Sequence, residues 1–103
     1  MSTSAAIKVD VALDPFEGSR KVMNLFAATK FKEGFKLLFQ YIHNFCKELQ
    51  NEVIKHKIRL ELILDSHHNG TISFDQYLDQ IDVVVGRVME TLNTAEQRFN
   101  ERL

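Results

Sequence analysis

The clearest hydrophobic pattern in the chain lies in its last third. Apolar residues recur there at alternating spacings of three and four: Leu78, Ile81, Val85, Val88, Leu92, Ala95 and Phe99. An α-helix turns once in about 3.6 residues, so residues at these spacings lie along one side of it. A row sustained over three heptads is typical of a coiled-coil seam. We therefore expect one helix from Phe74 to about Glu101, and name this row the C-terminal seam.

A second row of the same kind precedes it, here named the N-terminal seam. Its members are Phe31, Phe35, Leu38, Ile42, Phe45 and Leu49. Asp14 and Pro15 suit the N-cap and the first position of a helix, and Glu17 completes a capping box. We expect a first helix or helix pair from about Pro15 to Ser66, with Ala27–Thr29 as the candidate boundary between two helices.

Two segments alternate apolar and polar residues with a period of two, which is typical of a strand. The first, Ile7–Leu13, predicts an extended N-terminal arm over residues 1–14. The second, Lys57–Leu64, alternates as well, but its Leu, Glu, Arg and Lys residues are good helix formers. We favour helix there, and the alternative is an α+β fold with strands near 7–13 and 58–64.

The segment His67–Ile72 carries the signals of a tight turn. Asn69 and Gly70 tolerate the left-handed conformation that ends a helix. Ser73 and Gln76 form a capping box that starts the next helix. The fold class predicted is therefore all-α, with residues 15–103 as a single helical domain built on a long helical hairpin.

The two seams predict self-association. The final helix should span on the order of 40 Å, and such a hairpin cannot cover both apolar rows alone. A second copy of the chain would cover them, which predicts a homodimeric four-helix bundle.

The turn also offers a candidate metal loop. Its potential ligands are Asp65 in the first position, His67, Asn69, and Gln76 in the twelfth position, with Gly70 as the turn glycine and Ile72 in the apolar eighth position. In this order residues 65–76 resemble the calcium loop of an EF-hand, which implies a metal-responsive regulator. Two positions depart from the family pattern: His67 replaces a carboxylate, and Gln76 is neutral where a bidentate Glu belongs. We therefore favour a simple turn, with no metal and no cofactor.

Charge is unevenly distributed along this chain of 103 residues with a net charge of −1. Residues 15–59 hold nine Lys and Arg against four Glu, whereas residues 60–103 hold three Arg against eight Asp and Glu. Opposite halves favour packing against each other, and the near-neutral total does not favour nucleic acid as a partner.

Single residues add little chemistry. Cys46 lies in an apolar row, so we expect a buried thiol. Glu48, Glu52 and His56 share one side of a helix, and we expect that side to be solvated. The first ten residues lack the features of a signal peptide, and no apolar run approaches the length of a membrane span, which predicts a cytoplasmic protein.

No catalytic motif is apparent, so we expect no enzyme. The seams predict a protein–protein interaction module, such as an adaptor, an assembly factor or a chaperone-like protein. Its partner would be a second copy or another helical protein. The alternative is a peripheral membrane-surface protein, because Lys30–Phe45 combines aromatic residues with lysines.

Overall fold

The computed structural model describes residues 15–102, and these residues form helices joined by short turns. The elements are α2 (Pro15–Ala27), α3 (Phe31–Phe45), the 3₁₀ turn η1 (Lys47–Leu49), α4 (Gln50–His68) and α5 (Phe74–Arg102). No strand occurs within this range, so the predicted all-α class is confirmed. The extended arm predicted for residues 1–14 lies outside the described residues.

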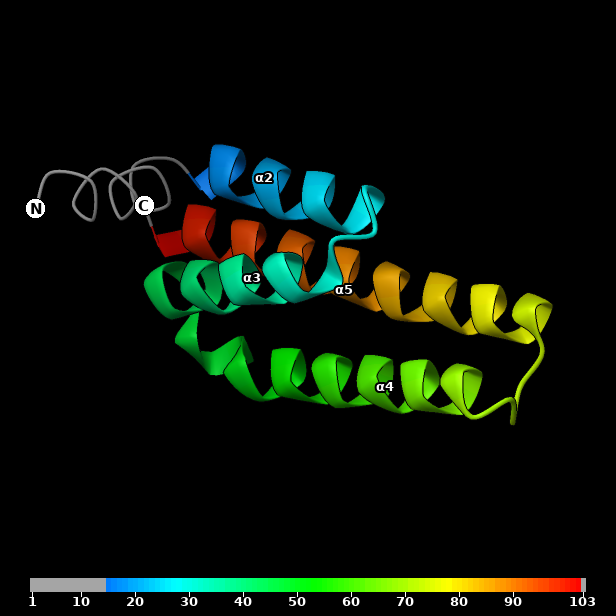
Figure 1. The fold of residues 1–103 in the computed structure, drawn as a ribbon. Helices are drawn as coiled ribbons and strands as arrows, with labels where there is room; N and C mark the ends of the chain where they lie inside the picture. The colour runs from blue at the N-terminus through cyan, green and yellow to red at the C-terminus, as the bar shows by residue number, and fades with distance from the viewer. Residues whose placement is uncertain (1–14, 103) are drawn as a thin grey trace, which may run out of the picture.

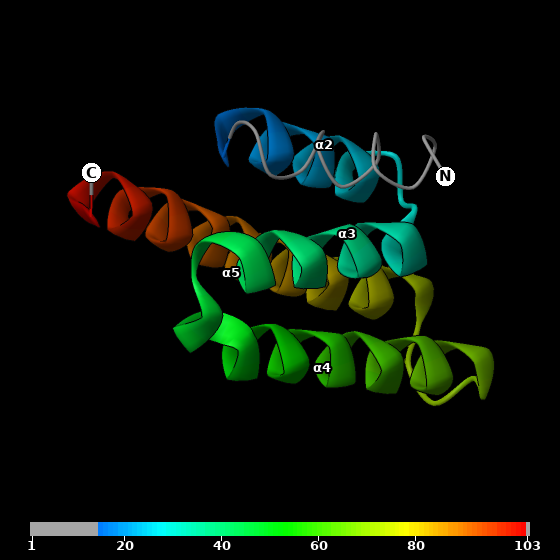
Figure 2. The same cartoon turned by 90° about the vertical axis from the view of Figure 1, so that its left-hand side faces the viewer.

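The helices pack as a bundle within one chain. α2 packs against α3 and α5, and α4 packs against α5 and α3. Figures 1 and 2 show α2 and α4 on opposite sides of α5, which runs the length of the molecule. Four helices of a single copy therefore make the bundle for which the sequence suggested two copies. Association with a second copy stays a prediction.

The first break in the N-terminal helical stretch lies at the boundary that the sequence indicated. Thr29 has φ 59°, its N–H donates to the carbonyl of Phe26 at 3.0 Å, and the N–H of Lys30 donates to that of Leu25 at 2.9 Å. This pair of bonds is a Schellman motif, which ends α2. A threonine occupies the left-handed position that glycine normally takes, so the turn is strained.

The second break, at Cys46, was not predicted. The backbone of Cys46 leaves the helix with φ −160° and ψ 72°, and η1 follows before α4 begins. No glycine or proline marks this point, and the apolar spacing of Ile42, Phe45 and Leu49 continues through it. The N-terminal seam therefore bends from α3 into α4, and the hydrophobic pattern alone could not show the bend.

The turn between α4 and α5 follows its sequence signals closely. Gly70 has φ 75°, and the N–H groups of Gly70 and Thr71 donate to His67 and Ser66 in a second Schellman motif. Ser73 and Gln76 form the expected capping box, with reciprocal bonds of 2.9 and 3.1 Å. The predicted hairpin and its turn are thus confirmed.

Residues 58–64 are helical, so the alternative strand there is wrong. The period of two has another cause, because α4 carries apolar residues on two opposite sides. Leu60 and Ile63 point into the core, whereas Ile58 and Leu62 are exposed.

Aromatic and aliphatic side chains from all four helices fill the core. Phe26 of α2 meets Phe35 of α3 edge to face, with ring centroids 5.0 Å apart. The same ring lies against Gly34, where a Cβ atom would be 2.9 Å from Phe26 Cε2. Gly34 therefore sets how closely α2 and α3 approach.

Candidate interaction surface at the end of the hairpin

Most of the predicted seam residues are buried inside this single chain. Phe35, Leu38, Ile42, Phe45, Leu49, Ile81, Val88 and Leu92 are buried, and Phe31, Val85 and Phe99 are half-buried. Of the predicted seam residues, Leu78 alone is exposed. The seams thus supply the core of one copy, and a small remainder of them faces solvent.

The exposure of Leu78 follows from the unequal lengths of the helices. α5 has 29 residues, whereas α2 has 13 and α3 has 15. At about 1.5 Å per residue, α2 and α3 are each about half as long as α5. In Figure 1 the end of the α4–α5 hairpin extends beyond both of them. Among the described helices, α4 alone packs against α5 there.

The apolar sides of α4 and α5 nevertheless continue into this uncovered end. On α5, Phe74 and Leu78 precede buried Ile81 in the same row and are 60% and 43% exposed. On α4, Leu64 continues the line of buried Leu60 one turn further and is 37% exposed. We name Leu64, Phe74 and Leu78 the tip patch. They are core positions that no element of the described chain covers.

The hairpin segment that carries this patch is acidic. Between Leu60 and Gly86 the chain has no Lys or Arg and five exposed carboxylates: Glu61, Asp65, Asp75, Asp79 and Asp82. Carboxylates without cationic neighbours create a local negative potential that attracts cations. The tip patch therefore combines apolar side chains with a negative surround.

A second apolar surface lies on the outer side of α4. Ile54, Ile58 and Leu62 follow each other at intervals of four and are exposed, on the side opposite the buried Val53 and Leu60. We name these three residues the outer stripe. Lys55, Lys57 and Arg59 lie among them in sequence, so this surface has mixed charge.

The candidate metal loop is used for helix ends and ring stacking. The side chain of Gln76 accepts from the Ser73 N–H, and the Asn69 N–H donates to the Asp65 carbonyl. The ring of His67 stacks on Tyr77 with centroids 4.3 Å apart. Within residues 15–102, no three His, Cys, Asp or Glu side chains gather closely enough to hold a metal ion.

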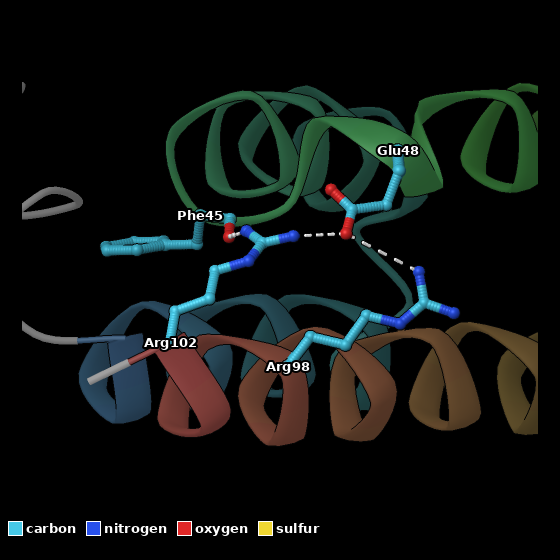
Figure 3. A network of polar contacts seen from close by, with 4 residues as sticks. All are labelled: Phe45, Glu48, Arg98 and Arg102. Carbon is cyan, nitrogen blue, oxygen red and sulfur yellow. Dashed lines mark hydrogen bonds and ion pairs between the residues drawn. The ribbon is translucent and has the colours of Figure 1, made fainter.

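The opposite end of the bundle is closed by an ionic cluster (Figure 3). Arg102 donates to the carbonyl of Phe45 at 3.3 Å and to the carboxylate of Glu48, and Arg98 lies 3.6 Å from the same carboxylate. The end of α5 is thereby joined to the bend between α3 and α4. The Phe45 carbonyl at the end of α3 thereby has a cationic hydrogen-bond partner.

The cluster also shifts two ionisation equilibria. A hydrogen bond from its own backbone N–H lowers the pKa of Glu48, and Cys46, Arg102 and Arg98 lower it further. Burial raises the pKa of the Cys46 thiol, and the neighbouring charge of Glu48 adds to this effect. The expectation of a buried Cys46 is confirmed, and its raised pKa favours the protonated thiol.

His56 departs from the solvated side predicted for it. It is buried between α4 and α5, with Nε2 2.9 Å from Thr91 Oγ1. Thr91 donates its own proton to the Arg87 carbonyl at 3.0 Å, so its oxygen accepts from His56. Burial lowers the pKa of His56, an effect that Glu52 partly opposes. Glu48 and Glu52 are exposed as predicted, and His56 is buried because it lies on the side of α4 that packs against α5.

A shallow depression of about 390 Å³ lies between α2 and α3. Its lining residues are Lys21, Asn24, Leu25, Ala28, Lys30 and Leu37. The two lysines make this region basic, in contrast to the acidic hairpin end. The aromatic residues Phe35 and Phe45 of the candidate membrane-surface segment are buried in the core.

Comparisons with protein-family models, curated proteins and solved structures find no match to this chain. No helix in residues 15–102 combines the length and apolar character needed to span a bilayer. The function is therefore inferred from the surface of the chain itself.

Sequence reasoning missed Leu64 and Phe74 as surface residues and missed the outer stripe. One signal was present, because the stretch from Leu60 to Gly86 lacks any cationic side chain. The lengths of α2 and α3 were the missing information, since they decide where the cover over α5 ends.

Proposed function

We propose that the protein is a non-enzymatic interaction module, of the adaptor, assembly-factor or chaperone-like kind, that binds a helical protein segment through the tip patch. One observation carries the proposal: the apolar sides of α4 and α5 continue beyond α2 and α3, and leave Leu64, Phe74 and Leu78 exposed. We expect the protein to act in the cytoplasm, as its sequence suggests.

The shape of this surface favours a helix as the bound element. Two packed helices present neighbouring apolar positions at the tip, and an amphipathic helix can lie across such a pair with its apolar side toward them. Full burial of a Leu or Phe side chain contributes about 1.5–3 kcal/mol. Covering the partly exposed tip patch therefore gives a modest affinity, suited to a reversible contact.

The proposed binding surface is smaller than the two seams that the sequence suggested. Their central residues already pack within the chain, so the uncovered end is the part left for a partner. A second copy and a different protein are both compatible with this role, and solution mass separates them.

The test compares three forms of the protein. The double variant Phe74→Ser, Leu78→Ser removes apolar surface at the tip. The control Val83→Ser changes a residue that is 53% exposed and lies outside the tip row of α5. Circular dichroism establishes that all three forms fold. Light scattering then gives their masses, and capture from extracts of the producing cells, quantified by mass spectrometry, compares the proteins retained.

The proposal expects a dimer or a retained partner that wild type and Val83→Ser share and the double variant loses. If all three forms are monomers with identical retained proteins, the tip patch is not a binding surface and the proposal fails.

A further inference from the structure

We infer that the segment bound at the tip is a basic amphipathic helix, with its apolar side on the tip patch and its lysines or arginines against the surrounding carboxylates. This inference rests on the proposed function and names the chemistry of the partner. It follows from where the acidic residues lie relative to the apolar ones.

On α5 the acidic residues adjoin the apolar row directly. Asp75, Asp79 and Asp82 are spaced by four and three, so they follow one side of the helix. They stand three residues before, one after and four after Leu78. Because successive residues are about 100° apart on a helix, these carboxylates border the apolar row of α5 on one side, beyond Leu78.

α4 provides the matching border on the other side. Glu61 and Asp65 are one turn apart, and they lie three residues before and one after Leu64. All five carboxylates are exposed. The surface over the tip patch is therefore apolar along its middle and negative along both edges.

A basic amphipathic helix has the complementary arrangement. Its apolar side covers the tip patch, and the long stems of lysine or arginine pack over leucine while their charges reach the carboxylates. Complementary charge of this kind speeds association and selects the partner more than it adds affinity. Nucleic acids and anionic membranes bring negative charge to this surface and are disfavoured.

A second copy is a weaker candidate for the same site. The basic depression between α2 and α3 could meet the acidic tip of another copy. That contact is head to tail, because the two surfaces differ, and it would continue into an open chain of molecules. The depression is also concave, whereas the partner at the tip patch should protrude, as a helix does.

The uncovered part of α5 sets the length of a suitable probe. α5 exceeds α3 by about 20 Å, which corresponds to a helix of roughly 14 residues. The probe is a fluorescein-labelled peptide of that length, with leucine along one side and lysine along the other. Two matched peptides complete the set: one replaces lysine by glutamate, and one keeps the leucine–lysine composition in an order that is not amphipathic.

Fluorescence anisotropy measures the binding of each peptide at low and high salt. The protein is used as the full chain in four forms: wild type, the double variant Phe74→Ser, Leu78→Ser, and two charge variants. The tip variant neutralises the three aspartates of α5 with Asp75→Asn, Asp79→Asn and Asp82→Asn. The control removes three exposed charges outside the hairpin end with Glu17→Gln, Glu33→Gln and Glu101→Gln.

We expect wild type and the charge control to bind the amphipathic leucine–lysine peptide alone, and high salt to weaken that binding. The double Ser variant and the triple Asn variant should each bind this peptide at least about tenfold more weakly. A tenfold change corresponds to about 1.4 kcal/mol. Backbone amide spectra should show the largest shifts between Leu60 and Gly86.

The other outcomes overturn the inference in distinguishable ways. Equal binding of the leucine–glutamate peptide shows that charge does not select the partner, and leaves the apolar contact of the proposed function intact. No binding by any peptide removes the basic helix as the partner, while the capture comparison still judges the proposed function. A mass that rises with concentration and falls in the tip variants identifies a second copy as the occupant.

Discussion

The two halves of α5 carry the same apolar row in different surroundings. Further along α5, Ile81, Val88, Leu92 and Ala95 lie in the core and are at most 8% exposed, whereas Phe74 and Leu78 in the first two turns are 60% and 43% exposed. The two segments have the same kinds of residue at the same helical spacing. They differ in the elements that cover them.

A row of apolar residues in a sequence therefore shows which side of a helix is apolar, but it does not show which element covers that side. In this chain α2 and α3 are each about half as long as α5, and Phe74 and Leu78 near the start of α5 face solvent with acidic residues around them. Substitutions at buried and at exposed positions of the molecule should therefore have different effects.

The largest expected effect comes from truncating one leucine in each half. Leu92 is fully buried, and Leu92→Ala should lower the free energy of unfolding by about 3 kcal/mol, because it leaves a cavity. Leu78→Ala removes the same atoms from an exposed position and should cost about 1 kcal/mol or less. Urea unfolding measures both. Equal losses would mean that the hairpin end is covered in solution.

The next effect concerns the closeness of the α2–α3 cover. Gly34→Ala places a methyl group 2.9 Å from Phe26 Cε2, and that ring is held by Phe35. Overpacking should cost about 1–3 kcal/mol. Gly86→Ala is the matched control on exposed α5, where nothing lies within 4 Å, and should stabilise by about 0.5–1 kcal/mol. Two changes of the same sign in thermal unfolding would contradict the proposed packing.

A smaller gain should follow from relaxing the turn that ends the cover. Thr29 holds φ 59° at a position suited to glycine, so Thr29→Gly should stabilise the protein by about 1 kcal/mol. Ala28→Gly, next to it and without a positive φ, should destabilise slightly. Differential scanning calorimetry compares the two Tm values. A loss for Thr29→Gly would show that the threonine side chain supports the turn.

The smallest expected effect is a pH dependence confined to the covered half. Burial lowers the pKa of His56 in the folded protein, so the unfolded chain binds the proton more tightly. Stability is therefore complete above the ordinary histidine pKa of about 6.5 and declines as the pH falls through the lowered value. The loss should be limited, because protonated His56 keeps its Nε2–H donor to Thr91.

Urea unfolding of wild type and His56→Gln across this pH range checks the sign. The variant should show a flatter profile, since the remaining histidines contribute equally to both proteins. A profile as steep as that of wild type would assign the dependence to another group.

Local signals in the sequence predicted the elements better than their packing. The α5 helix, the turn at Gly70 and the Ser73–Gln76 box follow from residues close together in the chain, whose preferences act without tertiary context. The break at Cys46 has no such signal. The burial of His56 depends on how α4 packs against α5, and the exposed tip depends on helix lengths, so neither could be predicted from spacing alone.

The turn between α4 and α5 also has a consequence for the order of folding. Five residues separate His68 from Phe74, so closing this hairpin costs little chain entropy. Docking α2 on α5 must instead bring together segments from opposite ends of the described chain. Local contacts form faster than distant ones, so α4 and α5 should pair in the folding transition state before α2 arrives. Kinetic φ-values near the turn should then exceed those in α2, because the hairpin would form before the far end of the chain docks on it.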